Sequence, residues 1–284
     1  MIKAGLILEG GGMRGTYTAG ILDFFMEKGL WFESSYGVSA GACHLCSYIS
    51  KQPGRSFRVA VNYLDDENYC SMKSLVETGD LFNVDMCYRR IPDELDPYDY
   101  ETASKWPGKA YAVVTNIETG KPEYLRMKDM RRDITAVQAS ASLPLVSRNV
   151  EIDGKLYLDG GMADSIPLRR SLKDGNKKNV IVLTRPFGYR KKPASLTNRE
   201  MMFLKYPKYP ALRRDMLRRH LVYNRTLDMI ERLEEAGRVF VFRPEPLVKI
   251  ERIEKDVKKL KVLYLQGYHD AAMNYKLLME YLNG

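Results

Sequence analysis

Apolar runs and amphipathic segments alternate along the first third of the chain. Residues 4–8 form a short apolar run that predicts a buried strand, and residues 17–28 carry apolar side chains at helical spacing. A second strand is predicted at 31–38 and a second helix at 40–50. Strands and helices that alternate at this density predict a mostly parallel sheet with helices on its faces.

The rest of the chain continues this pattern around a mostly helical and irregular stretch at 53–105. Further strands are predicted at 110–116, at a hairpin around Asp153-Gly154, at 180–184 and at 238–243, and further helices at 129–141, within 197–235, at 250–265 and at 267–282. We expect a three-layer α/β/α domain. Its catalytic core is residues 1–184, a basic helical insertion is 185–237, and 238–284 adds the last strand and the C-terminal helices of the same domain.

Composition predicts a cytoplasmic protein with a sizeable core. Hydrophobic residues make up 45% of the 284 residues, but no apolar run reaches the roughly 18 residues of a membrane span. Met1 leads almost directly into the first strand, which leaves no room for a signal peptide. The four cysteines, which we expect as free thiols, are Cys43, Cys46, Cys70 and Cys87. Cys43 and Cys46 share an apolar helix and predict core packing, so we expect no metal and no cofactor.

The formal net charge of +9 is concentrated in one segment. Residues 185–220 contain 11 Lys and Arg against Glu200 and Asp215, so the remainder of the chain is balanced. Aromatic residues are interspersed there, and both kinds of residue favour lipid head groups. We expect peripheral contact with the anionic inner face of the membrane, with the segment as a possible lid over the active site. The alternative is a solvated face paired with Glu231, Glu234 and Glu235. No nucleic acid is expected, because no recognition motif accompanies the charge.

The first chemical motif is the glycine turn Gly10-Gly11-Gly12-Met13-Arg14-Gly15, directly after the first strand. Three successive glycines allow a close backbone approach, so the N–H groups of Gly11, Gly12 and Met13 can converge on an anion beside the Arg14 charge. The spacing also fits a dinucleotide-binding turn, but the second strand does not end in the acidic residue that such a site needs. A tight turn without a ligand is the other alternative.

The second motif is Gly37-Val38-Ser39-Ala40-Gly41, at the end of the second strand. Its flanking glycines remove side chains that would clash at a sharp strand-to-helix turn, which exposes the Ser39 hydroxyl as a nucleophile. The alternative is a serine that only caps the helix.

A serine nucleophile needs a base, and the three histidines are poor candidates. His44 lies on the helix after Ser39, pointing away from it, and His220 and His269 lie on later helices. Asp159-Gly160-Gly161 follows a strand and leaves the carboxylate room. An aspartate is ionised at neutral pH and can accept a hydroxyl proton without histidine. Taken alone, the Asp159 motif favours an ordinary turn residue, and the two preceding motifs reverse that preference.

These motifs, together with the Ala139-Ser140-Ala141-Ser142-Leu143-Pro144 block and Pro167, resemble the patatin-like phospholipases over about residues 3–184. The resemblance implies a patatin-like fold, Ser39 as nucleophile, Asp159 as base and no metal. The family often has asparagines where this chain has Asp164-Ser165. We expect a serine lipid acyl hydrolase that acts through an acyl-enzyme. The alternatives are an acyltransferase that uses the same dyad, and a non-catalytic lipid- or nucleotide-binding module.

Overall fold

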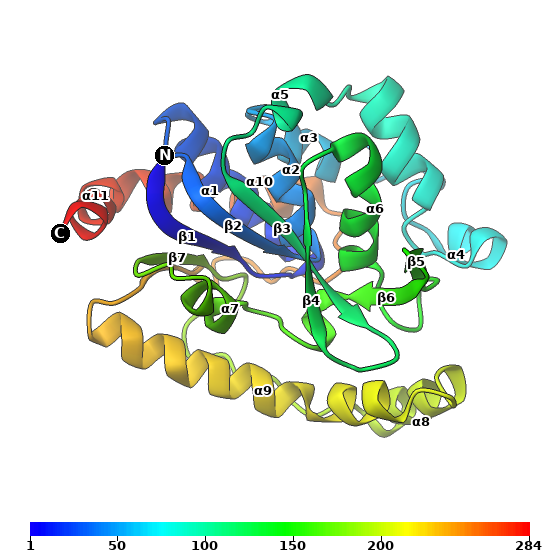
Figure 1. Ribbon diagram of the computed structural model, residues 1–284. Helices are drawn as coiled ribbons and strands as arrows, with labels where there is room; N and C mark the ends of the chain where they lie inside the picture. Colours follow the sequence, from blue (N-terminus) through cyan, green and yellow to red (C-terminus); the bar gives the residue numbers. More distant parts are fainter.

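The computed structural model describes residues 1–284 and contains one eight-stranded sheet flanked by helices (Figure 1). The strand order is β5-β6-β3-β2-β1-β7-β8, with β4 paired to β3 beside this path. The five strands from β3 to β8 in this order run parallel, whereas β4, β5 and β6 are antiparallel to their neighbours. The strands are β1 Ile2–Leu8, β2 Phe32–Val38, β3 Lys109–Asn116, β4 Pro122–Arg126, β5 Val150–Ile152, β6 Lys155–Asp159, β7 Asn179–Val182 and β8 Phe240–Phe242.

Helices cover both faces of the sheet. The α-helices are α1 Thr16–Glu27, α2 Ala40–Ile49, α3 Arg55–Val61, α4 Met72–Thr78, α5 Tyr100–Ser104, α6 Met130–Ala141, α7 Leu168–Lys173, α8 Leu196–Lys205, α9 Pro210–Glu235, α10 Val257–Met273 and α11 Tyr275–Asn283. Two short 3₁₀ turns, η1 Gly12–Gly15 and η3 Gly160–Met162, and a π-helix, η2 Met86–Leu95, complete the fold. None of these helices combines the length and the apolar character needed to cross a bilayer.

The alternation of side chains along β1 shows how the layers are built. Leu6 and Leu8 point into the larger core, which includes residues of α1, α2 and α10. Ile7 points the other way, into a second core with Leu168 of α7 and Leu227 of α9. Successive strand residues face opposite sides of a sheet, so a strand covered on both faces is apolar throughout. The three-layer α/β prediction is confirmed.

The predicted boundaries of the C-terminal helices were wrong. Residues 250–256 are not helical, because Asp256 caps the helix by accepting hydrogen bonds from the N–H groups of Lys258 and Lys259. Gly267, predicted as the first residue of the last helix, lies within α10. A Cβ there would lie 2.1 Å from the Tyr17 carbonyl oxygen of α1. Gly267 therefore allows α1 and α10 to pack closely and does not begin a new helix.

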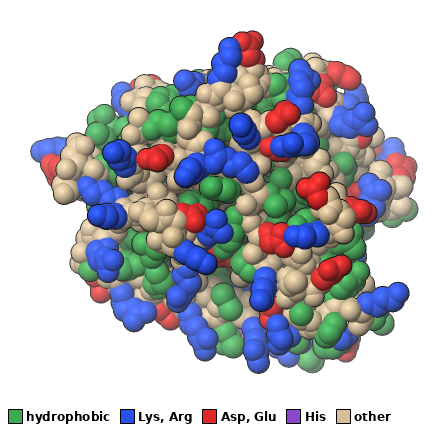
Figure 2. Space-filling model, viewed as in Figure 1, with side chains coloured by type: hydrophobic (Ala, Val, Ile, Leu, Met, Phe, Trp, Pro, Cys, Tyr) green, Lys and Arg blue, Asp and Glu red, His purple; other side chains and the backbone are tan.

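Residues 185–235 run along one side of the domain. In Figure 1, α8 and α9 run in succession below the sheet, and α9 continues toward β8, which pairs in parallel with β7. Figure 2 shows Lys and Arg side chains along this lower part of the molecule.

Candidate active site

The sheet topology brings the ends of β2 and β6 to the two sides of β3. Val38, the last residue of β2, pairs with Val113, and Asp159, the last residue of β6, pairs with Val114. Neighbouring strands lie about 4.8 Å apart, so Ser39 and Asp159 follow strand ends separated by only two strand spacings. The glycine turn after β1 lies beside them, because β1 is the other neighbour of β2.

Ser39 occupies a strained turn between β2 and α2. Its φ is 54° and its ψ is −124°, a conformation that costs energy for any residue with a Cβ. Side chains at the flanking glycines would collide with backbone atoms, since a Cβ at Gly37 would lie 2.5 Å from the Ala42 Cα and one at Gly41 2.5 Å from the Leu8 oxygen. Ala40 begins α2 directly after the turn. The turn has the geometry of a nucleophile elbow.

The end of α6 holds both Ser39 and Asp159. The Ser39 N–H donates to Ser140 Oγ at 2.9 Å, and the Ser140 hydroxyl donates to the Val113 oxygen at 2.6 Å. Two residues later, the Ser142 oxygen accepts from the Asp159 N–H at 2.8 Å. The serine-rich block, which at the sequence level was only part of a family resemblance, thus fixes the positions of two residues 120 apart in the chain.

The Asp159 carboxylate is buried and only half satisfied. The side chain is 2% exposed. Its Oδ1 accepts from the Gly161 N–H at 2.7 Å, whereas Oδ2 is buried without a hydrogen-bond partner. Burial raises the pKa of Asp159, and the Ser39 hydroxyl and the Arg219 charge oppose this shift. Ser39 lies close enough to influence the carboxylate but makes no hydrogen bond to it in this structure.

The glycine turn carries free backbone donors beside Ser39. The N–H groups of Gly10, Gly11 and Gly12 have no hydrogen-bond partner, and a Cβ on Gly10 would lie 2.8 Å from the Ser39 Cβ. The Met13 N–H, expected among the donors, instead bonds the Arg252 carbonyl oxygen at 3.0 Å. The Met13 N–H is therefore not a free donor, and residue 252, which was predicted to lie in a helix, lies against the turn.

Two other members of the turn face different surroundings. Arg14 extends into the space beside Ser39, where its Nε is buried without a partner. Burial and the charges of Arg185 and Arg252 lower its pKa to about 10. Gly15 packs against the imidazole of His44. Gly160 and Gly161 form the turn after Asp159, where a Cβ on Gly160 would lie 2.0 Å from the Val113 oxygen.

No histidine is hydrogen-bonded to Ser39 or Asp159, although His44 and Ser39 line the same cavity. His44 lines an apolar cavity, and burial lowers its pKa to about 4, so its imidazole is neutral at physiological pH. The His220 Nδ1 contacts the Leu217 oxygen within α9, and His269 lies beside Asp270 on α10. Neither of these two lines a cavity that contains Ser39.

Ser39 lies where two cavities of opposite character meet. The larger, hereafter the apolar cavity, is lined by 24 residues, of which 16 are hydrophobic. The smaller, hereafter the polar chamber, also contains Asp159 and the glycine turn. Ser39, Gly12 and Leu143 line both.

Sequence reasoning missed most of the polar chamber. Besides the predicted residues, it is lined by charged and hydroxyl groups from five segments: Glu9, Ser165, Thr184, Arg185, Lys191, Arg219, Tyr223 and Arg252. Glu9 is 3% exposed and is held by the Thr184 N–H at 2.7 Å and the Tyr223 hydroxyl at 2.6 Å. The available signal was the basic segment 185–220, which supplies three of these residues.

The basic segment is therefore divided among different surroundings. Arg185, Lys191 and Arg219 line the polar chamber. Arg190 pairs with Asp228 at 3.1 Å and with Glu231 at 2.9 Å, as the solvated-face alternative expected for Glu231. Only part of the segment's charge is thus free to face a membrane.

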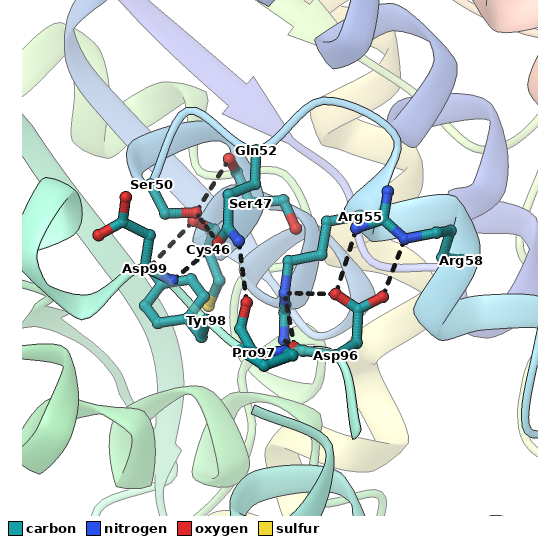
Figure 3. A network of polar contacts seen from close by, with 10 residues as sticks. All are labelled: Cys46, Ser47, Ser50, Gln52, Arg55, Arg58, Asp96, Pro97, Tyr98 and Asp99. Carbon is teal, nitrogen blue, oxygen red and sulfur yellow. Dashed lines mark hydrogen bonds and ion pairs between the residues drawn. The ribbon is translucent and has the colours of Figure 1, made fainter. Parts of the chain in front are cut away.

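A polar network secures one wall of the apolar cavity (Figure 3). The buried Arg55 donates to the Asp96 backbone oxygen at 2.8 Å, and the Asp96 carboxylate also accepts from Arg58 at 2.9 Å. Gln52 donates to the Pro97 oxygen at 2.9 Å, and the Tyr98 hydroxyl donates to the Cys46 oxygen at 3.0 Å. The network ties the α2–α3 connection to the chain after η2.

Replacing Asp96 with alanine is expected to destabilise the fold by about 3 kcal/mol, because Arg55 would remain buried without its counter-charge. The side chains of Arg55 and Asp96 are 8% and 11% exposed. Asp96→Asn keeps hydrogen-bond acceptors and is expected to cost less. Urea unfolding measures both, with the exposed Asp65→Ala as control. Equal free energies of unfolding for Asp96→Ala and the control would show that the network does not stabilise the fold.

Comparison with known proteins identifies the family. Residues 6–171 match the family model described as "Patatin-like phospholipase", and residues 209–283 match "Domain of unknown function (DUF6363)". Over 189 residues, the chain is 31% identical to "Uncharacterized protein YjjU" of Escherichia coli (strain K12), covering 65% of this chain and 52% of that protein. Over 193 residues, it is 24% identical to "Probable lipid hydrolase 463L" of Invertebrate iridescent virus 6, covering 61% of this chain and 65% of that one.

Among solved structures, the "Crystal structure of VipD from Legionella pneumophila" aligns with a TM-score of 0.44 and 12% identity, over 99% of this chain and 66% of that chain. The chain spans between half and two thirds of the length of the curated relatives named above. The family model alone matches more than half of the chain and includes the glycine turn, Ser39 and Asp159. This chain belongs to the patatin-like phospholipase family.

Proposed function

We propose that this protein hydrolyses carboxylic esters of lipids, with Ser39 as nucleophile and Asp159 as base. One observation carries the proposal: a strained serine stands at the junction of an apolar cavity and a polar chamber, and the chamber holds a buried carboxylate with one free oxygen. An acyl chain suits the apolar cavity, and the rest of the ester suits the chamber. The viral relative named a probable lipid hydrolase is consistent with this assignment.

In the first half of the proposed reaction, the Ser39 oxygen attacks the ester carbonyl carbon while its proton passes to Asp159 Oδ2. The carbonyl oxygen becomes an oxyanion, which the free N–H groups of Gly10, Gly11 and Gly12 stabilise by hydrogen bonds. The bond to the leaving alcohol then breaks, and Asp159 returns the proton to that alcohol. The product is an acyl ester on Ser39.

In the second half, water attacks the acyl-enzyme, with Asp159 again as base, and the fatty acid leaves as Ser39 recovers its proton. Transfer of the acyl group to an alcohol or thiol would proceed from the same intermediate. Product analysis with and without such an acceptor separates hydrolase from acyltransferase.

A fluorophosphonate probe tests the assignment directly, because it reacts with activated serines. Mass spectrometry is expected to find the label on the peptide that contains Ser39. Ser39→Ala should abolish labelling, and Ser104→Ala, an exposed serine away from both cavities, should retain it. A protein that takes up no label would support the non-catalytic binding module.

The pH dependence of kcat/KM for a neutral ester is expected to lack an inflection near 6.5. Activity should fall only as the pH drops through the pKa of Asp159, since a protonated carboxyl cannot accept the serine proton. His44, with its pKa lowered to about 4, is not a substitute base. The profile of His220→Gln should match that of the unaltered protein. An inflection near 6.5 that disappears in this variant would point to a histidine base.

We further propose that α8 contacts anionic membrane surfaces. It exposes Leu196, Met201, Phe203 and Leu204, with exposed fractions of 74% for Leu196 and 80% for Leu204. Lys and Arg near such a surface contribute about 1 kcal/mol each. We expect sedimentation with acidic vesicles but not with neutral ones, and weaker binding by Leu196→Ser/Leu204→Ser. Val76→Ser, at an 81% exposed position on α4, is the matched control. Equal binding to both vesicle types would contradict the proposal.

A further inference from the structure

Five cationic side chains converge in the polar chamber: Arg14, Arg185, Lys191, Arg219 and Arg252. None of them forms an ion pair. Two carboxylates share the chamber, but Glu9 is already bonded to Thr184 and Tyr223, and Asp159 faces Ser39. The chamber therefore carries an excess of positive charge in a space partly removed from water, which is unfavourable unless an anion enters it.

The cations repel one another. Burial and the charges of Arg219, Arg252 and Arg185 lower the pKa of Lys191 to about 7, although Glu9 opposes the shift. Burial likewise lowers the pKa of Arg219. The buried, unpartnered Nε of Arg14 is a free donor at the same place. A bound anion would relieve these unfavourable interactions together.

Neighbouring residues fix the positions of Lys191 and of the Arg252 backbone. The peptide of Lys191 is bonded on both sides by Asn224, whose Oδ1 accepts from the Lys191 N–H at 2.8 Å and whose Nδ2 donates to the Lys191 oxygen at 3.1 Å. The Lys191 Nζ lies 4.3 Å from the centre of the Tyr223 ring. The Arg252 backbone is fixed by its bond to Met13. The cluster is thus part of the built structure of the chamber.

Four of the five cations come from outside the part of the chain that matches the family model. Arg14 lies within residues 6–171, whereas Arg185, Lys191, Arg219 and Arg252 lie beyond them. Their convergence beside Ser39 is a feature of this chain's later segments, and it is not implied by the catalytic motifs.

We infer that the polar chamber binds an anionic head group, so that the preferred substrates are lipid esters whose head group has a net negative charge, above all a phosphomonoester. The inference rests on the proposed function, because it places the scissile ester at Ser39 between the chamber and the apolar cavity. A phosphomonoester carries nearly two negative charges at neutral pH and can accept several charge-assisted hydrogen bonds. A zwitterionic head group also carries a positive charge, which the cationic side chains of the chamber repel, so it should bind less tightly.

The test compares three esters with one short acyl chain, which keeps them monomeric: monoacylglycerol phosphate, monoacylglycerol phosphocholine and monoacylglycerol. The kcat/KM of the phosphomonoester is expected to be at least about tenfold that of the other two, the factor that one good ionic contact supplies. Lys191→Gln and Arg252→Gln should each lower the ratio of phosphomonoester to neutral ester severalfold. The matched control is the neighbouring Lys192→Gln, an exposed lysine outside the chamber, which should keep the ratio.

A pH series adds a second readout. Lys191 faces Arg185, Arg219, Arg252 and Glu9, and it loses its charge as the pH rises through about 7. The ratio should therefore fall between pH 7 and pH 9, a range in which the phosphomonoester stays doubly charged, and this fall should be absent in Lys191→Gln.

Binding to Ser39→Ala, measured by calorimetry, separates failure of this inference from failure of the proposed function. If no ester is hydrolysed but the variant binds monoacylglycerol phosphate more tightly than monoacylglycerol, the chamber inference stands and the hydrolase proposal falls. If all three esters are hydrolysed at equal kcat/KM, the hydrolase stands and the inference is overturned. If inorganic phosphate binds as tightly as monoacylglycerol phosphate, the site is one for a free anion, and the head-group assignment is overturned.

Discussion

Asp159→Asn is expected to lower kcat/KM for a neutral lipid ester by about 10⁴-fold while leaving the fold intact. The asparagine oxygen can still accept the Gly161 N–H, which bonds Oδ1 in the native protein at 2.7 Å. The atom that replaces Oδ2 is an amide nitrogen, which cannot accept the serine proton. Ser39→Ala should lose at least as much activity. The double variant should be no worse than the poorer single one, because the two residues act as a unit.

Steady-state kinetics and thermal unfolding together measure this result. The control is Asp153→Asn, in the exposed turn between β5 and β6, where φ is 51° and asparagine is well tolerated. It should retain full activity. Losses in Ser39→Ala and Asp159→Asn that multiply in the double variant would mean that the two groups contribute independently, and the dyad would have to be abandoned.

Gly10→Ala is expected to lower kcat by about 10²–10³-fold, the usual cost of losing an oxyanion donor. A Cβ at this position would lie 2.8 Å from the Ser39 Cβ and 2.9 Å from the Val38 oxygen. Because these are short-range contacts with the nucleophile and its strand, the turn must shift and its N–H groups must move off target. The KM should change much less than kcat, since the donors act mainly on the transition state.

Gly154→Ala provides the comparison for Gly10→Ala. Gly154 lies in a hairpin turn with open space around it, so an added methyl group meets nothing within 4 Å. Its φ of 75° makes alanine unfavourable, and the variant should therefore lose stability without losing rate. An unchanged kcat in Gly10→Ala would show that the glycine turn does not stabilise the oxyanion.

The first two strands and two helices could be predicted from the sequence because the patterns that indicate them are local. The alternation of β1, α1, β2 and α2 follows from apolar runs and helical periodicity. Parallel strands end at one edge of the sheet, so motifs after β1 and β2 must lie together. Asp159 was harder to place, because β6 reaches β3 by antiparallel pairing that no local pattern specifies.

The rest of the site depends on contacts between distant segments. The sequence predicted a helix from residue 250 onward. Residues 250–256 are instead irregular, and this stretch carries Arg252. The Arg252 carbonyl oxygen accepts a hydrogen bond from the Met13 N–H, and residue spacing alone could not indicate this contact. The basic segment signalled an anion, but composition could not separate the cations that point inward from those on the surface. A new helix was predicted to begin at Gly267, because the sequence does not show that this glycine packs against α1 in the middle of α10.

The hydrogen bonds that Ser140 and Ser142 accept have a mechanical consequence. Ser39 and Asp159 are both anchored to the same short stretch at the end of α6, one through Ser140 Oγ and the other through the Ser142 carbonyl. A fluctuation of that stretch therefore carries the two in common, and their separation changes less than either absolute position. The proposed proton transfer depends on the distance between Ser39 and Asp159, and a shared anchor keeps that distance more constant when the surrounding structure moves.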